Sequence, residues 1–312
     1  MTPVNWGEGR ARVSLIILRR KEVPVDKQIT AEGVVGQIKN GDTIVIGGWG
    51  PTRKPMTLIR EIAKSKLKDL TVMSLGALDV DLLIGAGKVK KLIFPFMSLE
   101  GAPGRLEHFN RARVEGTIEV MELSEYMFIS GLKAAAERLP FYPTRSGLGT
   151  DILTMNPEIV TFEAPYTGEK LVAMPALNAD VALIHANTAS PEGYAQILGD
   201  QLWDHIMVRA AKKVFVSAER IITRKQMKDD LANIRILSPW VTGVVETPYG
   251  AHPGICFPEY TNPDAGHLGE YAKAAADVEA FKGYLDKYVT KVKDQAAYIE
   301  LVGGLKKLAK LR

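Results

Sequence analysis

Short runs of β-branched residues alternate with helical patterns along the first half of the chain, and this alternation limits the fold more than any other feature. The strands predicted at residues 43–46, 70–75, 89–94 and 117–121 are separated by segments whose apolar residues have helical spacing. Strands that alternate with helices of roughly 10 to 15 residues indicate a mostly parallel sheet. We therefore expect an open α/β fold, with helices on both faces of the sheet.

The second half of the chain is less regular. We expect strands at 170–174, 180–186, 213–217 and 241–246, an irregular stretch at 151–168, and one or two helices over 277–301. No stretch rich in Ser, Gly or Pro marks a flexible linker. A single large domain with a smaller sub-domain is therefore favoured over two separate domains.

The composition excludes several classes of protein. With 46% hydrophobic residues among 312, the chain is able to bury a sizeable core. Cys256 is the one cysteine, so an intrachain disulfide and a cysteine-based zinc site are excluded and a reducing, cytoplasmic location is favoured. A net charge of +4 and 7% aromatic residues argue against a nucleic-acid surface. The apolar run at 13–18 is shorter than the roughly 20 residues that cross a bilayer.

The glycine-rich turn after the first strand is the most informative local feature. Gly47, Gly48, Trp49 and Gly50 are followed by Arg53-Lys54-Pro55, which opens a helix. Ligands of open α/β sheets bind at the carboxyl ends of the strands, and backbone amides near a helix N-terminus attract anions. The spacing matches neither the dinucleotide fingerprint nor the phosphate loop. The alternative is a tight turn in which Arg53 and Lys54 are merely solvated.

Two glutamates lie at the next informative strand-to-helix junction. Ser124 is a plausible helix cap, and Glu125 in the first turn is favoured by the helix dipole, so capping alone explains it. The functional alternative is a carboxylate at the mouth of the crevice that shuttles protons. Glu122 and Glu125 are the candidate catalytic residues.

Two later loops, 139–150 and 248–253, carry further polar candidates. The first contains Arg145, Gly147 and Gly149, and the second contains Gly250 and His252. A lone histidine in a turn is more often structural than catalytic. The five histidines form no H-E-x-x-H pattern and no G-x-S-x-G elbow is present, so we expect no metal site and find little support for a serine hydrolase.

Several phrases, taken together, resemble the α subunit of family I coenzyme A transferases, the glutaconate type most of all. They are 47–50 with 53–55, 139–149, 185–193 and 248–253. The resemblance runs from about residue 26 to the C-terminus. It implies one transferase-like domain over 26–312 and an N-terminal extension over 1–25.

This resemblance implies a CoA thioester as substrate, with no permanently bound cofactor, and an obligate β subunit in an αβ or α2β2 assembly. The active site would lie between the subunits, and the nucleophilic glutamate would belong to β. The amides of 47–50 and the cations of Arg53 and Lys54 would face the thioester carbonyl or a substrate carboxylate. The remaining substrate-binding candidates are Arg145, Gly147, Gly149, Gly250 and His252.

The stretch 49–149 also resembles the α subunit of the steroid ring-opening hydrolase, which cleaves a carbon–carbon bond of a cyclic β-diketone CoA thioester. Aligned through 139–141, that enzyme's catalytic glutamate falls on Glu125, where glutaconate-type transferases tend to carry an amide. Glu122 is the second choice if the alignment slips. A glutamate is able to take a proton from water and an amide is not. We expect CoA transfer first and ring-opening hydrolysis second, and the competing class is a non-catalytic subunit that binds acyl-CoA or acts as a scaffold.

Overall fold

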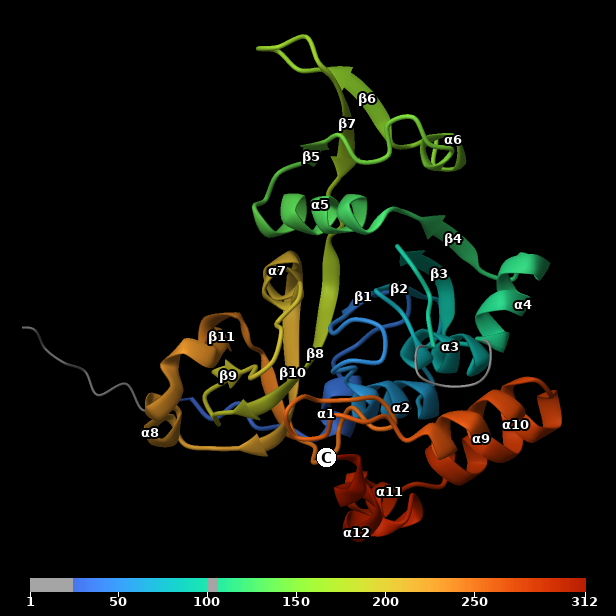
Figure 1. Ribbon diagram of the computed structural model, residues 1–312, viewed down its shortest axis with the longest axis vertical. Helices are drawn as coiled ribbons and strands as arrows, with labels where there is room; N and C mark the ends of the chain where they lie inside the picture. The colour runs from blue at the N-terminus through green and yellow to red at the C-terminus, as the bar shows by residue number, and fades with distance from the viewer. Residues whose placement is uncertain (1–24, 100–105) are drawn as a thin grey trace, which may run out of the picture.

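The computed structural model describes residues 25–99 and 106–312 (Figure 1). Except for Val25, the expected N-terminal extension lies outside these residues. Across the described residues a sheet of nine strands forms the centre. Seven of them run parallel in the order β12-β10-β8-β1-β2-β3-β4. Their bounds are β1 Thr43–Ile46, β2 Leu70–Ser74, β3 Val89–Phe94, β4 Glu119–Glu122, β8 Ala179–Ala189, β10 Ala211–Ile221 and β12 Gly243–Glu246. The other two strands are antiparallel: β9 Ala195–Gln196 pairs with the last residues of β8, and β11 Ile234–Ile236 pairs with β9.

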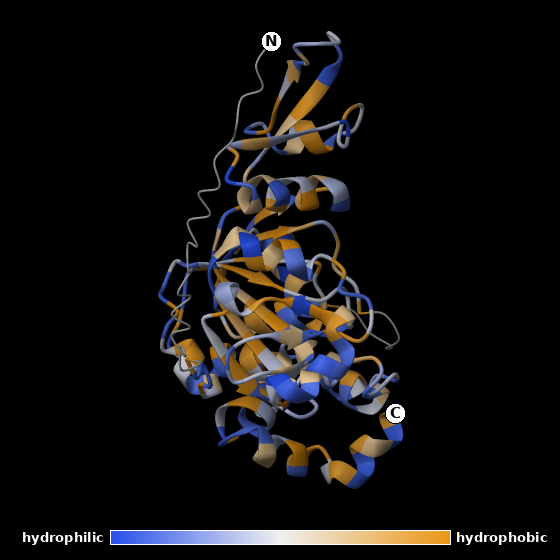
Figure 2. Ribbon diagram, turned by 90° about the vertical axis from the view of Figure 1, so that its left-hand side faces the viewer, coloured by the Kyte–Doolittle hydropathy of each residue, from blue (hydrophilic) through white to orange (hydrophobic). Residues whose placement is uncertain are grey.

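Helices cover both faces of this sheet because its strands alternate apolar residues between two cores. In β1, Ile44 and Ile46 join one core while Val45 joins the other. The first core contains residues of α1 Ala31–Val35, α2 Met56–Lys64, α3 Leu78–Gly85, α4 Glu107–Glu115, α9 Ala265–Ala275, α10 Val278–Leu285, α11 Gln295–Leu301 and α12 Gly304–Leu308. The second contains residues of α5 Glu125–Ala136 and α7 Asp204–Ala210. Figure 2 shows the apolar residues gathered along the sheet between these layers. The α/β expectation is confirmed.

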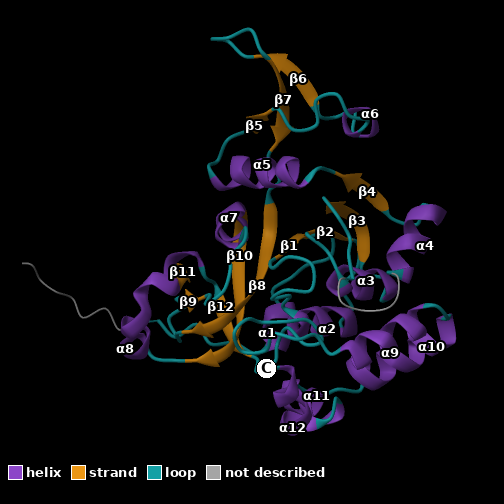
Figure 3. Cartoon of the chain, viewed as in Figure 1, coloured by secondary structure: helices purple, strands orange, loops and turns teal. Residues whose placement is uncertain are grey.

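The expected sub-domain is a three-stranded antiparallel sheet in the order β5-β7-β6. Its strands are β5 Phe141–Thr144, β6 Val160–Glu163 and β7 Lys170–Pro175, and α5 lies between them and the main sheet (Figure 3). The irregular stretch expected at 151–168 is wrong in part, because it holds β6 and the short α6 Ile152–Met155. The sequence does not predict β6 because three of its four residues are exposed, so its apolar and polar residues do not mark a buried face.

The second half contains more regular structure than its sequence pattern indicates. Strands β8 and β10 are each 11 residues long and pair in register along most of their length. The expected helical stretch at 277–301 is divided into α10, a π-helical turn at Asp286–Thr290, and α11. A short helix α8 at Arg224–Met227 follows β10. In the described part of the chain, no helix has the length and apolar character needed to cross a membrane.

The order of the parallel strands defines where a ligand would bind. From β1 the chain builds outward through β2, β3 and β4, and it then returns to place β8 on the other side of β1. The strand order therefore reverses between β1 and β8. In open α/β sheets, the crevice at the carboxyl ends of such a strand pair is the ligand site. Gly47–Gly50 follows β1 at this position.

A buried carboxylate joins three helices of the first core and gives a testable pH dependence. Asp81 of α3 accepts hydrogen bonds from the Tyr271 hydroxyl at 2.6 Å and the Phe109 amide at 2.8 Å. Burial, opposed by these hydrogen bonds, raises the pKa of Asp81 to about 6. The protonated native form is thus favoured, so its contribution to stability is complete below the ordinary pKa and is lost as the pH rises through 6.

We expect the wild-type protein to lose about 1 kcal/mol of unfolding free energy from Asp81 between pH 5 and pH 8. This loss is part of the about 3 kcal/mol that the full change in pKa represents. Asp81→Asn removes the ionisation and should flatten that part of the profile, as measured by urea denaturation at the two pH values. An unchanged pH dependence in the variant would contradict the assignment.

Candidate functional site

The turn Gly47–Gly50 joins β1 to α2 at the strand-order reversal. Gly48 has φ +73°, and a Cβ there would lie 2.2 Å from the Thr52 carbonyl oxygen, so only glycine fits. Trp49 is half-buried and packs against Phe96, with ring centroids 4.9 Å apart. Trp49 and Phe96 therefore form an aromatic pair at the carboxyl end of β1.

The amides of this turn are all used inside the protein. The amide of Gly47 donates to Leu183, that of Trp49 to Thr52 and that of Gly50 to Leu75, each to a carbonyl oxygen. The amide of Gly48 donates to the Asp204 carboxylate at 2.8 Å. The expectation that these amides face a thioester carbonyl is therefore wrong for this structure, because each already has a protein acceptor.

Arg53 also differs from both interpretations of the sequence, since it is neither solvated nor directed at a crevice. Its side chain is 1% exposed and forms an ion pair with the fully buried Asp204. The guanidinium also donates to the carbonyls of His185 at 3.2 Å and Asp200 at 2.7 Å. The physical reason is that a buried charge needs a buried partner. Arg53 thus connects the middle of β8 to the segment that leads into α7.

Lys54, like Arg53, is buried and pairs with a buried carboxylate. Its ammonium group, 2% exposed, lies 3.4 Å from the Asp79 carboxylate and donates to the Ser74 hydroxyl at 3.0 Å. Burial lowers the pKa of Lys54, and Asp79 opposes that effect. The expectation that Lys54 meets a substrate carboxylate is corrected, because an internal carboxylate occupies that position.

Of the two candidate catalytic glutamates, Glu125 is the exposed one. It is the first residue of α5, and the cap of this helix is supplied by Ser124, whose hydroxyl accepts from the Met127 amide. Capping therefore does not require the Glu125 carboxylate, which instead accepts a hydrogen bond from the Trp203 indole at 3.1 Å. Glu122 ends β4 and is half-buried, and its carbonyl accepts from Asn156.

The loop after β5 lies beside the start of α5. The Ser146 and Ser124 hydroxyl groups are 2.6 Å apart, and Gly147 is buried at φ +94° against the Met127 side chain. Gly149 is exposed at φ +74°. Arg145 points away to Glu169, whose hydrogen bond raises the pKa of Arg145. The structure thus brings 146–149 toward Glu125 but directs Arg145 to an exposed ion pair.

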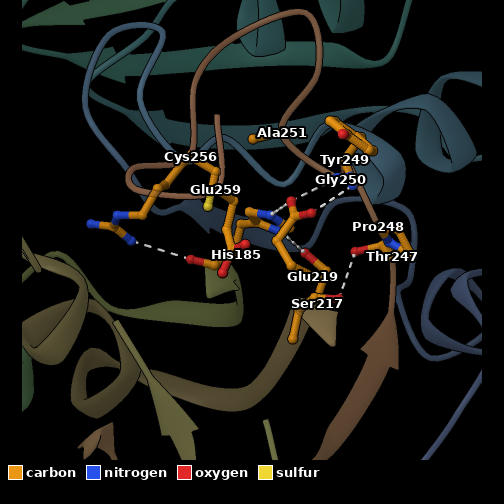
Figure 4. Close-up of polar contacts among 12 residues, drawn as sticks. His185, Ser217, Glu219, Thr247, Pro248, Tyr249, Gly250, Ala251, Cys256 and Glu259 are labelled. Atoms are coloured by element: carbon orange, nitrogen blue, oxygen red, sulfur yellow. Dashed lines mark hydrogen bonds and ion pairs between the residues drawn. The ribbon is translucent and has the colours of Figure 1, made fainter. Parts of the chain in front are cut away.

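The second predicted loop packs over a buried polar network in the carboxyl halves of β8 and β10 (Figure 4). His185 contacts the Ser217 hydroxyl at 2.9 Å and the Glu219 carboxylate at 2.8 Å. Glu219 also accepts from the amides of Tyr249 and Gly250. Gly250 therefore fixes the loop to the sheet, and its amide does not point to a crevice.

Two groups of this region are unsuited to contact a substrate. His252 is fully buried between the Tyr298 hydroxyl at 2.9 Å and Asp264 at 3.3 Å, and burial lowers its pKa, so the expected binding role is corrected to a structural one. Burial raises the pKa of the Cys256 thiol well above its ordinary value, which keeps it protonated and unreactive.

Among the described residues, one group of three potential metal ligands lies close together: His185, Glu219 and Cys256. The Glu219 carboxylate already accepts four hydrogen bonds, from His185, two amides and the Tyr260 hydroxyl. An ion would have to displace these donors. We therefore interpret the cluster as a satisfied network that fixes the loop.

Removing this buried charge should destabilise the protein. Glu219→Gln replaces an acceptor of four donors by an amide that itself donates, and we expect a loss of about 2–3 kcal/mol of unfolding free energy in urea denaturation. Glu246→Gln is the matched control, because Glu246 is exposed and accepts one amide hydrogen bond from Ile221. Equal effects of the two substitutions would contradict the role given to Glu219.

A groove of about 760 Å³ lies elsewhere, lined by α1, α2, β12 and α11. Arg60 is buried in its wall over the Tyr298 ring, 3.5 Å from the ring centroid, and donates to Gln295. None of the candidate residues at Gly47–Gly50, Glu122 or Glu125 lines this groove. Glu125 is exposed and lies outside this groove.

Sequence reasoning missed Trp203, Asp204 and Glu219. Trp203 is 78 residues from Glu125, so no local pattern connects them. Asp204 precedes an apolar helical pattern and resembles an ordinary first-turn acid. The one available signal for Glu219 is its place in an otherwise apolar strand, where a charged residue needs partners.

Comparisons with known proteins agree with this arrangement. A family model described as coenzyme A transferase matches residues 28–242. The chain is 40% identical over 278 residues to the IpdA component of the cholesterol ring-cleaving hydrolase of Rhodococcus jostii, covering 86% of this chain and 94% of that protein. It is 32% identical over 294 residues to one of the subunits of the glutaconate CoA-transferase of Acidaminococcus fermentans, covering 88% and 90%.

The structure of glutaconate coenzyme A-transferase from Acidaminococcus fermentans superposes with a TM-score of 0.86 at 29% identity, covering 91% of this chain and 95% of that one. A match of this extent goes far beyond any single motif. With its fold, its glycine turn and its relatives in agreement, this chain belongs to the coenzyme A transferase family.

Proposed function

We propose that this chain is the α subunit of a heteromeric enzyme that moves CoA between an acyl-CoA thioester and a carboxylic acid. The supporting observation is the exposed Glu125 carboxylate, which accepts a hydrogen bond from the Trp203 indole, in a member of the transferase family. The thioester is the substrate, and no permanently bound cofactor is required. A β subunit supplies the nucleophilic glutamate and the other half of the cleft, in an αβ or α2β2 assembly.

A cytoplasmic location accompanies this proposal. The one cysteine, Cys256, is buried and reduced. A chain that needs no disulfide suits a reducing compartment.

Hydrolysis is the second candidate, and one observation favours it specifically. Glu125 is an exposed carboxylate that accepts a hydrogen bond from the Trp203 indole, and Ser124 rather than Glu125 caps the helix. Such a group is able to act as a general base toward water. The relative that shares 40% identity is part of a ring-cleaving hydrolase. In this role the chain itself contributes the base.

The two reactions are separated by trapping the intermediate. The chain is co-expressed with the β-type protein of the neighbouring reading frame, incubated with dicarboxylic and steroid CoA thioesters, and treated with borohydride. Transfer predicts a reduced glutamyl residue on the partner. Hydrolysis predicts product formation in water without an acceptor acid and no trapped residue. Binding of the thioesters without either reaction would favour a non-catalytic scaffolding role.

A further inference from the structure

The contact between Trp203 and Glu125 brings together two helix starts that are distant in sequence. Trp203 immediately precedes α7, and Glu125 is the first residue of α5. The indole has a single N–H donor and no acceptor, so its contact with a carboxylate is directional. The distance of 3.1 Å is that of a hydrogen bond.

One oxygen of the Glu125 carboxylate is therefore fixed and the other is left for chemistry. The indole donates to Oε1, and within the described part of the chain no hydrogen bond reaches Oε2. An exposed glutamate otherwise samples several side-chain rotamers, and ordering such a side chain costs up to about 2 kcal/mol. Because the Trp203 indole already holds the Glu125 carboxylate in one orientation, this ordering cost is not added to the activation free energy of the reaction.

Trp203 is itself held by buried groups. The next residue, Asp204, is fully buried, and its carboxylate accepts from the Gly48 amide and pairs with Arg53. The Arg53 guanidinium also donates to the carbonyl of Asp200. The segment 200–204 is thus attached through Asp204 to the glycine turn and through Asp200 to Arg53.

The backbone of this segment is strained at the residue before Trp203. Leu202 has φ +51°, a left-handed conformation that costs a non-glycine residue on the order of 1–3 kcal/mol. Its amide donates to the Asp200 side chain at 2.8 Å, which helps to maintain this turn. The chain therefore reaches Trp203 through a turn of fixed conformation, which limits where the indole that contacts Glu125 can lie.

We infer that Trp203 is a positioning residue, which orients the Glu125 carboxylate and is held in place by the buried Arg53–Asp204 pair. This inference rests on the proposed function of Glu125 and identifies the group that aligns it. Trp203 does not react; it acts through the orientation of Glu125.

A double-mutant cycle on the co-expressed complex tests the inference through activity. Trp203→Phe keeps an aromatic ring and removes the donor, and we expect kcat to fall about tenfold with little change in KM, equivalent to about 1.4 kcal/mol. In the Glu125→Gln background the same substitution should change the residual rate less than twofold. Trp240→Phe is the control and should leave activity unchanged. The same tenfold loss in both backgrounds would show a merely structural role and overturn the inference.

A second readout does not depend on turnover. The indole ¹H–¹⁵N resonance of Trp203 in the complex, assigned by its loss in Trp203→Phe, should move during acid titration as the carboxyl group is protonated. It should stay still in Glu125→Gln, and the Trp240 resonance should be insensitive in both proteins. Identical titration of the Trp203 resonance with and without Glu125 would overturn the inference. A moving resonance in an inactive complex would instead support the contact while contradicting the proposed function.

Discussion

Glu125→Gln should lower the rate of water-dependent cleavage of a CoA thioester substrate by about 10²–10⁴ while leaving KM nearly unchanged. The side-chain amide keeps the shape and an acceptor oxygen for the Trp203 indole, but it is unable to take a proton from water. Acceptor-dependent CoA transfer should fall much less, by roughly tenfold, because its covalent glutamate lies on the partner. Steady-state kinetics of the co-expressed complex, with and without an acceptor acid, measure both rates.

Glu122→Gln is the matched control for this experiment. Glu122 is a carboxylate three residues earlier, at the end of β4, and among the described residues the Trp203 indole donates to Glu125 and not to Glu122. We expect near-wild-type rates for this variant. A severe loss in Glu122→Gln with an active Glu125→Gln would exchange the roles of the two glutamates and contradict the site described above.

Asp204→Asn should destabilise the protein by about 3–5 kcal/mol of unfolding free energy. The substitution leaves the Arg53 guanidinium, 1% exposed, without its countercharge in the interior. It also weakens the acceptor of the Gly48 amide, so the glycine turn and the start of α7 lose their common anchor. Urea denaturation of the purified complex, followed by circular dichroism, measures the change.

The half-exposed pair Arg220–Glu259 provides the comparison. Its side chains are 54% and 14% exposed, so solvent still screens the pair and Glu259→Gln should cost about 1 kcal/mol or less. If Asp204→Asn were as mild as this substitution, the buried pair would not be the anchor of the segment that carries Trp203.

The fold was largely predictable because its first half repeats one pattern. Most residues of the strands at 43–46 and 70–74, and the last three of the strand at 89–94, are buried, which makes these stretches mostly apolar and easy to recognise. The strand β6 and the helix α7 were missed for opposite reasons. β6 is exposed on its outer positions, and α7 is short and starts on a buried aspartate that resembles a surface acid.

The site was predictable in position but less so in the role of each group. The glycine turn and Glu125 were placed at the carboxyl ends of strands, as found. The cations Arg53 and Lys54 were expected to face a ligand, but Asp204 and Asp79 hold them inside the protein. Sequence spacing does not reveal which carboxylate a buried cation meets, because that partner comes from another part of the chain.

The central claim is that this chain encodes half of a catalytic cleft, with Glu125 as the carboxylate it contributes. The most direct measurement is a structure of the co-expressed complex with a CoA analogue whose thioester sulfur is replaced by a methylene group. We predict that the Glu125 carboxylate lies within hydrogen-bond reach of the reacting carbonyl group or of one water beside it, at about 2.6–3.2 Å. An acyl group bound in the groove beside Arg60 and Tyr298, with Glu125 touching neither ligand nor partner, would contradict the account.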